Sequence, residues 1–197
     1  MNSVHQCAKS VQIMRKNDHY YLTKLIFDIE YEQNVIMDKA IMEKAFKTKV
    51  DKVSDLTAYV GKTVGISEWI QIEQKNIDSF AAGTLDQQWI YTDPVAAANH
   101  SPYGTVVAQG FLILALIPKF AYETLHIEDA EMGLNYGLDR VRFPQAVPVD
   151  NYIRGKVDLV GYEIIDGGAR IKLYITTEIK DEEKPACVAE FIIQLYN

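Results

Sequence analysis

The chain has 197 residues, of which 48% are hydrophobic, and a formal net charge of -7. This length and apolar content suffice for one sizeable core, so we expect one main domain. The acidic balance, 27 Asp and Glu against 20 Lys and Arg, disfavours a protein that neutralises phosphate backbones. We therefore expect no nucleic-acid partner.

The cysteines and the apolar runs indicate a cytoplasmic protein. Cys7 and Cys187 are the only cysteines, and they form neither a disulfide framework nor a metal-ligand spacing, so we expect no metal site. Residues 1–15 contain no continuous apolar stretch of signal-peptide length. The most apolar run, Val106 to Ile117, is well short of the roughly 20 residues that cross a bilayer, so we expect no membrane span.

The first fifty residues differ in character from the rest and show no firm hydrophobic period. Within them, apolar residues at helical spacing predict a short amphipathic helix over Ile36–Phe46. We expect residues 1–50 to form an N-terminal appendage, helical in part, and residues 51–197 to form the main domain.

The pattern becomes clearer from Ser54 onward. Ser54 is a suitable N-cap and Gly61 can end a helix with positive φ, so a short helix is predicted between them. Alternation of apolar residues over Val64–Ile72 predicts a half-buried strand. The spacing of Ile77 and Ala81 then predicts a second helix.

The middle of the chain contains the main helix signal. Asp93 and Pro94 are typical of an N-cap followed by proline at the first helical position, and they predict a short helical turn. Residues Asn99–Gly104 have the composition of a loop. Thr105–Ile117 is apolar almost all round, which predicts a helix buried on most sides, and Pro118 should end or kink it.

The C-terminal third predicts a meander of three antiparallel strands. These strands are Tyr152–Ile164, Ala169–Ile179 and Ala186–Leu195. Their apolar and polar residues alternate, as with Ile171 beside Arg170, so the sheet buries one face and keeps one polar face. The sequence therefore predicts an α+β domain in which a helix packs on an antiparallel sheet.

Several separated segments resemble one enzyme family. Asp86 alone is a weak signal, because an acidic residue in a linker is usually a solvated turn former. Together, however, the segments 83–94 and 105–112 resemble the MaoC-like acyl-CoA dehydratases and (R)-specific enoyl-CoA hydratases, in which a D-x-N-P-I-H-x-D stretch precedes an A-H-G-x-L stretch. The sequences Asn135-Tyr136-Gly137 and Val141-Arg142-Phe143-Pro144 are similar to the nodulation-protein-N branch of that family.

The resemblance implies a fold, an assembly and a reaction. The fold would be a hot-dog fold, an antiparallel sheet wrapped around a central buried helix, and the usual unit would be a homodimer. The reaction would be that of a hydro-lyase that interconverts 2-enoyl-CoA and 3-hydroxyacyl-CoA, with the coenzyme A thioester as substrate and no other cofactor. By position, Asp86 corresponds to the carboxylate that deprotonates the attacking water, and Gly110 to an amide donor for the thioester oxygen.

Two positions depart from the family pattern. Tyr91 occupies the place of the histidine in the first motif, and Gln109 that of the histidine in the second. A phenol has a reference pKa near 10 against about 6.5 for imidazole, so Tyr91 is poorly matched to proton exchange at neutral pH. We expect Tyr91 to act as a hydrogen-bonding partner at the catalytic site. Gln109 keeps hydrogen-bonding capacity and is assigned with Gly110 to substrate binding.

These departures leave reduced activity, changed chemistry and a retained binding role open. One alternative is an acyl-CoA thioesterase, which could use one carboxylate and a helix N-terminus without any histidine. Another is a non-catalytic hot-dog module that binds an acyl group or serves as a dimer partner. His100 lies in the loop before the main helix, where a histidine is more often solvated than catalytic.

Overall fold

The computed structural model describes residues 44–197, of which Ala45–Asn197 form one unit. The predicted helix over Ile36–Phe46 therefore lies almost wholly outside the described residues. The five residues of strand β1, Phe46–Val50, fall in the stretch predicted as an appendage. They pair with strands β2 and β4, so they belong to the sheet of the main unit.

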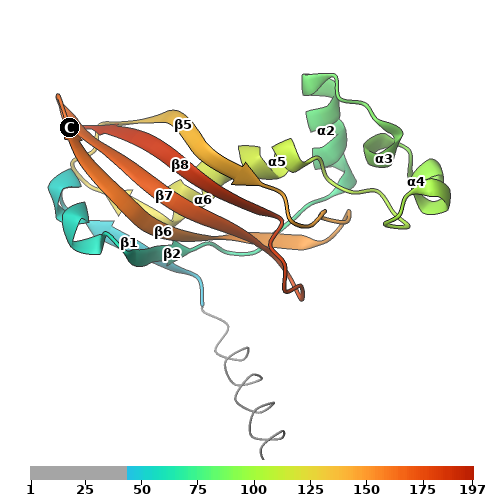
Figure 1. Cartoon of the computed structure of the whole chain (residues 1–197), viewed down its shortest axis with the longest axis horizontal. Helices are drawn as coiled ribbons and strands as arrows, with labels where there is room; N and C mark the ends of the chain where they lie inside the picture. The colour runs from blue at the N-terminus through green and yellow to red at the C-terminus, as the bar shows by residue number, and fades with distance from the viewer. Residues whose placement is uncertain (1–43) are drawn as a thin grey trace, which may run out of the picture. The chain divides into compact units, whose positions relative to one another are not determined.

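An antiparallel sheet forms the body of this unit (Figure 1). Within residues 44–197 its strand order is β4-β1-β2-β6-β7-β8-β5, with β3 paired to β6, and only the contact between β1 and β4 is parallel. The remaining strands are β2 (Lys62–Ile66), β3 (Ile70–Gln71), β4 (Leu125–Ile127), β5 (Met132–Arg142), β6 (Tyr152–Ile165), β7 (Gly168–Ile179) and β8 (Cys187–Tyr196).

The predicted C-terminal meander is confirmed. β6, β7 and β8 pair in sequence order, and no end of these strands differs from its predicted bound by more than one residue. Burial alternates along β7, where Ile171, Leu173 and Ile175 are almost completely buried. These side chains point toward the helices, and their burial holds the two layers together.

The edge strand β5 was not indicated by the sequence pattern. Two bulges, between Asn135 and Gly137 and between Leu138 and Arg140, interrupt its pairing with β8. Asn135, Leu138 and Val141 pair with buried β8 residues and therefore lie on the helix side of the sheet. Because each bulge adds one residue, the residues on that side recur at every third position instead of every second.

The helices of this unit are short. They are a 3-10 helix (Val53–Tyr59), α2 (Gln74–Thr84), α3 (Trp89–Thr92), α4 (Pro94–His100), α5 (Gly110–Ala115) and α6 (Ile117–Thr124). Gly61 has φ +83 after the 3-10 helix, as predicted. The Asp93 carboxylate caps α4 by accepting hydrogen bonds from the backbone N–H groups of Val95 and Ala96. None of the helices in this part of the chain has the length and hydropathy of a membrane span.

The main apolar run does not form one helix from Thr105. Its first residues are extended, because Ala108 N–H donates to Val147 O at 2.8 Å and Val149 N–H donates to Val106 O at 3.0 Å. Helix starts only at Gly110. Pro118 lies in the first turn of α6, where its missing N–H is not needed, so it separates α5 from α6.

Two glycines let α6 approach the backbone of the sheet closely. A Cβ on Gly155 of β6 would lie 2.5 Å from Phe120 Cβ, and a Cβ on Gly65 of β2 would lie 2.4 Å from Thr124 Cβ. Phe120 and Thr124 belong to α6 and are fully buried. Larger residues at either glycine would push the helix away from the sheet.

We predict that Gly155→Ala lowers the free energy of unfolding by about 1–3 kcal/mol, because the added methyl group overlaps Phe120. Gly137→Ala is the matched control, since a Cβ there meets nothing within 4 Å. The measurement is urea denaturation followed by circular dichroism. Equal midpoints for the two variants would contradict the proposed helix contact.

Candidate active site

An apolar cavity of about 510 Å³ lies between α5, α6 and the edge strand β5. On the helix side it is lined at i, i+3, i+4 and i+7 by Phe111, Leu114, Ala115 and Pro118. The cavity is also lined by Phe80, Thr84, Asp86, Ile117, Asn135, Gly137, Leu138 and Phe191.

The cavity corrects the prediction that this helix is buried on most sides. Phe111 is 66% exposed and Ala115 is also exposed, although both belong to the apolar run. Phe120 and Ile117, farther along, are almost completely buried. One stripe of the helix therefore packs on the sheet, while another lines an open apolar space.

Two contacts, one from the helices to β5 and one to Phe143 directly after β5, show how the cavity is oriented. At the start of α5, the rings of Phe111 and Phe143 lie 5.9 Å apart with an edge-on geometry. At the other end, the Tyr122 hydroxyl of α6 contacts the Asn135 side-chain oxygen of β5 at 3.3 Å. β5 thus runs antiparallel to α5 and α6, and the lining residues lie between these contacts.

Asp86 lies at the end of the cavity that is next to the start of α5. The Gln109 side chain before α5 donates to Ile77 O of α2 at 3.3 Å, which holds the two helices together. Phe80 and Thr84 of α2, and then Asp86, line the cavity from this side. Figure 1 shows α2 beside the start of α5. The carboxylate predicted from the resemblance is therefore at one end of an apolar cavity.

The backbone turns sharply just before Asp86. Leu85 ends α2 in a left-handed conformation, with φ 62 and ψ 17, which is uncommon for a residue other than glycine. Its side chain is 82% exposed, so no packing holds it there. Asp86 Oδ1 accepts a hydrogen bond from Gln88 Nε2 at 3.2 Å. Within residues 44–197 its second oxygen has no hydrogen-bond partner and is available to a ligand.

Tyr91 is electrostatically coupled to Asp86 without lining the cavity. It lies in α3, half-buried, and its backbone carbonyl accepts a hydrogen bond from Gln74 Nε2 at 2.9 Å. Partial burial raises the pKa of Tyr91, and the charge of Asp86 and the neighbouring Tyr103 raise it further. The phenol therefore stays neutral at physiological pH and can donate a hydrogen bond.

Gln109 and Gly110 have different surroundings from each other. Gln109 is 1% exposed, and its Oε1 is buried without a hydrogen-bond partner in this part of the chain. It does not line the cavity, and its observed role is to join α5 to α2. Gly110 is the first residue of α5, and a Cβ there would lie 3.0 Å from Phe143 Cγ. A side chain at this helix start would therefore press against the Phe143 ring, which would have to shift by a few tenths of an ångström.

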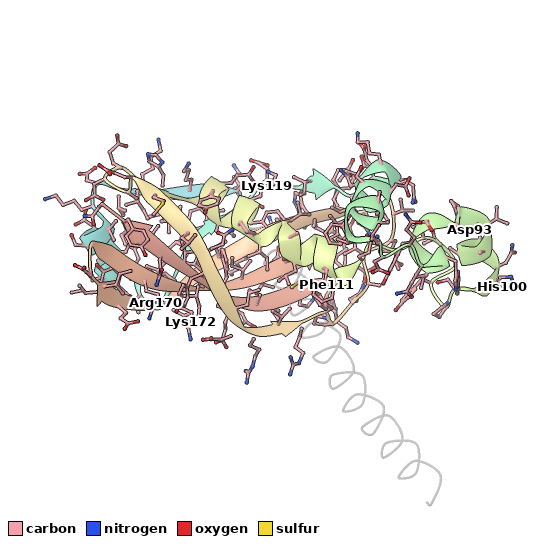
Figure 2. All side chains as sticks on the ribbon, turned by 90° about the horizontal axis from the view of Figure 1, so that it is seen from above. Asp93, His100, Phe111, Lys119, Arg170 and Lys172 are labelled. Carbon is pink, nitrogen blue, oxygen red and sulfur yellow. The ribbon has the colours of Figure 1, made fainter. Side chains whose placement is uncertain are left out.

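Two other candidate groups lie apart from the cavity. His100 is the last residue of α4, and Figure 2 shows it at the end of the unit remote from Phe111. Cys187 is buried in the core, and burial raises its thiol pKa to about 11. Neither residue lines the cavity.

Sequence reasoning missed most of the cavity wall. Leu138 on the bulged strand, and Phe80 and Thr84 on α2, belong to no motif, and Asn135 was noted only for its family resemblance and not as part of a cavity wall. The stripe of Phe111, with its neighbours at i+3, i+4 and i+7, is visible in the sequence. Its open face could not be distinguished from a buried one by composition.

The sheet, the α5–α6 helices packed on one of its faces and the cavity between helix and edge strand define a hot-dog-fold protein. The (R)-hydratase PhaJ1 of Pseudomonas aeruginosa shares this fold, with a TM-score of 0.58 at 17% identity over 69% of this chain and 83% of that one. The (R)-hydratase from A. caviae involved in PHA biosynthesis gives a TM-score of 0.57 at 15% identity, over 68% of this chain and 96% of that one.

Sequence comparison identifies the family. The MaoC like domain matches residues 55–184, and the chain belongs to this MaoC-like dehydratase family. It is similar to 3-hydroxyacyl-thioester dehydratase Z of Mycobacterium tuberculosis, with 41% identity over 145 residues, 73% of this chain and 95% of that protein. Nodulation protein N of Rhizobium leguminosarum bv. viciae is 38% identical over 142 residues, 71% of this chain and 88% of the relative. The predicted family, branch and hot-dog fold are thus confirmed.

We predict that Asp86→Asn lowers the pKa of Tyr91 toward its ordinary value, because the mutation removes a neighbouring negative charge. The titration can be followed by NMR of ring-labelled tyrosine, with Tyr91→Phe to assign the signal. Asp166→Asn is the matched control, since Asp166 is an exposed residue of the turn between β6 and β7 that does not contribute to the shift. An identical Tyr91 titration in wild type and Asp86→Asn would show that the two side chains are not coupled.

Proposed function

We propose that this protein interconverts 2-enoyl-CoA and 3-hydroxyacyl-CoA, with Asp86 as the catalytic carboxylate. The observation that carries the proposal is the position of Asp86, the only ionisable residue among the described residues that line the apolar cavity. Such a cavity suits an acyl chain, and a single polar group at its end suits the reacting carbon atoms. The 41% identity to a 3-hydroxyacyl-thioester dehydratase supports the same reaction class.

The chemistry requires two proton transfers. In the dehydration direction the bond between the α-carbon and its hydrogen breaks, and the 3-hydroxyl group leaves with a proton as water. We infer that Asp86 performs both transfers in turn, taking the α-proton as carboxylate and returning it to the leaving hydroxyl as carboxylic acid. Hydration is the same sequence reversed.

Tyr91 and Gly110 have supporting roles in this proposal. The raised pKa of Tyr91 makes it a poor base at neutral pH, so it acts as a hydrogen-bond donor near Asp86. Gly110 is the first residue of α5, where a backbone N–H has no partner inside the helix. Such an N–H can stabilise the negative charge that develops on the thioester oxygen.

We predict that Asp86→Asn lowers kcat for crotonyl-CoA hydration by about two to four orders of magnitude, since it removes the general base. Tyr91→His is expected to raise kcat, because imidazole exchanges protons near neutral pH. Hydration can be followed by the loss of absorbance of the conjugated thioester. Asp166→Asn, in the exposed turn between β6 and β7, is the control and should retain wild-type activity.

Three other outcomes would replace this proposal. Equal hydration rates for wild type and Asp86→Asn would exclude Asp86 as the base. Release of free thiol from acyl-CoA would indicate a thioesterase. Acyl-CoA binding without turnover in wild type would indicate a binding module that has lost catalysis with its histidine.

We also propose that a second copy of the chain pairs along β5. This strand is the last in the sheet order, so its outer edge has no strand partner within residues 44–197. Met132, Leu134, Tyr136 and Leu138 of β5 are all exposed large apolar or aromatic side chains. A long apolar edge strand is an aggregation hazard unless another chain covers it.

A homodimer is therefore the expected state in analytical ultracentrifugation. Replacing Met132 and Leu134 with lysine should weaken the dimer at least about tenfold, because it places charges at the proposed interface. Ile164→Lys is the control, since Ile164 is 81% exposed near the turn between β6 and β7. A monomeric wild type at micromolar concentration would contradict this assembly.

A further inference from the structure

The end of the cavity remote from Asp86 contains an unexplained polar side chain. Asn135 lines the cavity from β5, opposite an apolar helix stripe and beside Leu138. The other polar side chains of the lining, Thr84 and Asp86, come from the opposite end. The Thr84 hydroxyl already donates to Phe80 O at 2.7 Å. Asn135 thus provides the polar side chain at the end of the cavity remote from Asp86.

The strand geometry places the Asn135 side chain on the helix side of the sheet. Asn135 pairs with Ile193, whose side chain is buried beneath the helices. Its Oδ1 lies 3.3 Å from the Tyr122 hydroxyl, which donates to it. Within residues 44–197 the Nδ2 group has no hydrogen-bond partner. The amide therefore offers its N–H donors at the end of the cavity.

The length of the cavity can be estimated from two elements. Phe111 and Pro118 are seven residues apart along the helices, which corresponds to about 10 Å at the α-helical rise. On β5, a bulge lies between Asn135 and Leu138, and their β8 partners Ile193 and Phe191 are two residues apart, which corresponds to about 7 Å at the strand rise. An acyl chain that starts beside Asp86 would reach Asn135 after about 7–10 Å.

We propose that Asn135 makes the site selective for acyl chains that carry a neutral oxygen, as hydroxyl or carbonyl, near their far end. Such an oxygen would accept a hydrogen bond from Asn135 Nδ2. An alkyl chain of the same length would remove water from this amide without replacing the hydrogen bond, and that costs binding energy. The proposal rests on the proposed function for the nature of the thioester, and it adds the substrate class.

The test compares two 3-hydroxyacyl-CoA thioesters of equal length, one ending in a methyl group and one in a hydroxyl group. Their dissociation constants are measured by isothermal titration calorimetry on the full chain with Asp86→Asn, so that turnover does not interfere. We expect the hydroxyl-ended thioester to bind about three to ten times more tightly, the usual worth of one net hydrogen bond. Asn135→Leu in the same background should abolish this preference.

Two controls separate the inference from effects on folding. Asn99→Leu changes an exposed asparagine of α4 that bonds to Val95 O, and it should leave the preference intact. A 3-hydroxybutyryl thioester is too short to reach Asn135, so it should bind equally well with and without Asn135→Leu. Unequal binding of this short thioester would indicate that the variant disturbs the cavity as a whole. The nearly isosteric variant Asn135→Asp would then replace Asn135→Leu as the probe. Because a carboxylate offers no hydrogen-bond donor, we expect Asn135→Asp to lose the preference for the hydroxyl-ended thioester.

Equal affinities for the two long thioesters, or a preference that survives Asn135→Leu, would overturn the inference. Failure of the proposed function has a different signature. If the hydroxyl-ended thioester is preferred but wild type turns over neither compound, the cavity selects oxygenated acyl chains without the proposed reaction. Binding of neither long thioester would overturn both.

Discussion

The structure depends on the close packing of α6 against strands β2 and β6. Gly65 and Gly155 remove the side chains that would otherwise separate helix and sheet, and Phe120 and Thr124 occupy the space. Because the helix is held against this side of the sheet, the other side of the same helical segment is left apart from β5. The cavity is the space that remains, and two local contacts, Phe111 with Phe143 and Tyr122 with Asn135, bridge it at either end.

The chemistry follows from what lies at each end of that space. Asp86 follows a left-handed residue at the end of α2, and the bond from Gln109 to Ile77 keeps α2 next to the start of α5. Asp86 thus lies at one end of a cavity with largely apolar walls, electrostatically coupled to the neutral phenol of Tyr91. The family relationship gives the reaction class, and the position of Asp86 supports its place in the proposed reaction. In that proposal Tyr91 occupies the place of the family histidine, and Asp86 alone transfers protons.

The sequence predicted the parts of the fold whose hydrophobic pattern follows a simple period. The strands β6 to β8 alternate regularly, and the capping of α4 by Asp93 follows a local rule. β5 was not predicted because its bulges place Asn135, Leu138 and Val141 on one side at every third residue. This spacing matches neither the period of a strand nor that of a helix. The predicted start of the main helix was wrong because the apolar residues before Gly110 are buried in an extended segment held by Val147. Tertiary contacts, not local preference, decide both.

The candidate site was only partly visible in the sequence. Asp86 and Tyr91 stand out through the family motif, yet nothing in that motif locates the apolar cavity. Asn135 and Phe80 are separated by more than fifty residues and meet only because β5 and α2 approach the same helices. Likewise, the exposure of Phe111 depends on the gap beside it. From composition alone, Phe111 would be assigned to the core.

We propose that the cavity between α5, α6 and β5 holds the acyl chain with its reacting carbons beside residue 86. A crystal structure of Asp86→Asn with a bound 3-hydroxyacyl-CoA tests this placement. We expect the acyl chain between the Phe111–Pro118 stripe and β5, with the 3-hydroxyl within hydrogen-bond distance of residue 86. An acyl chain bound elsewhere, or bound in this cavity with its 3-hydroxyl remote from residue 86, would contradict it.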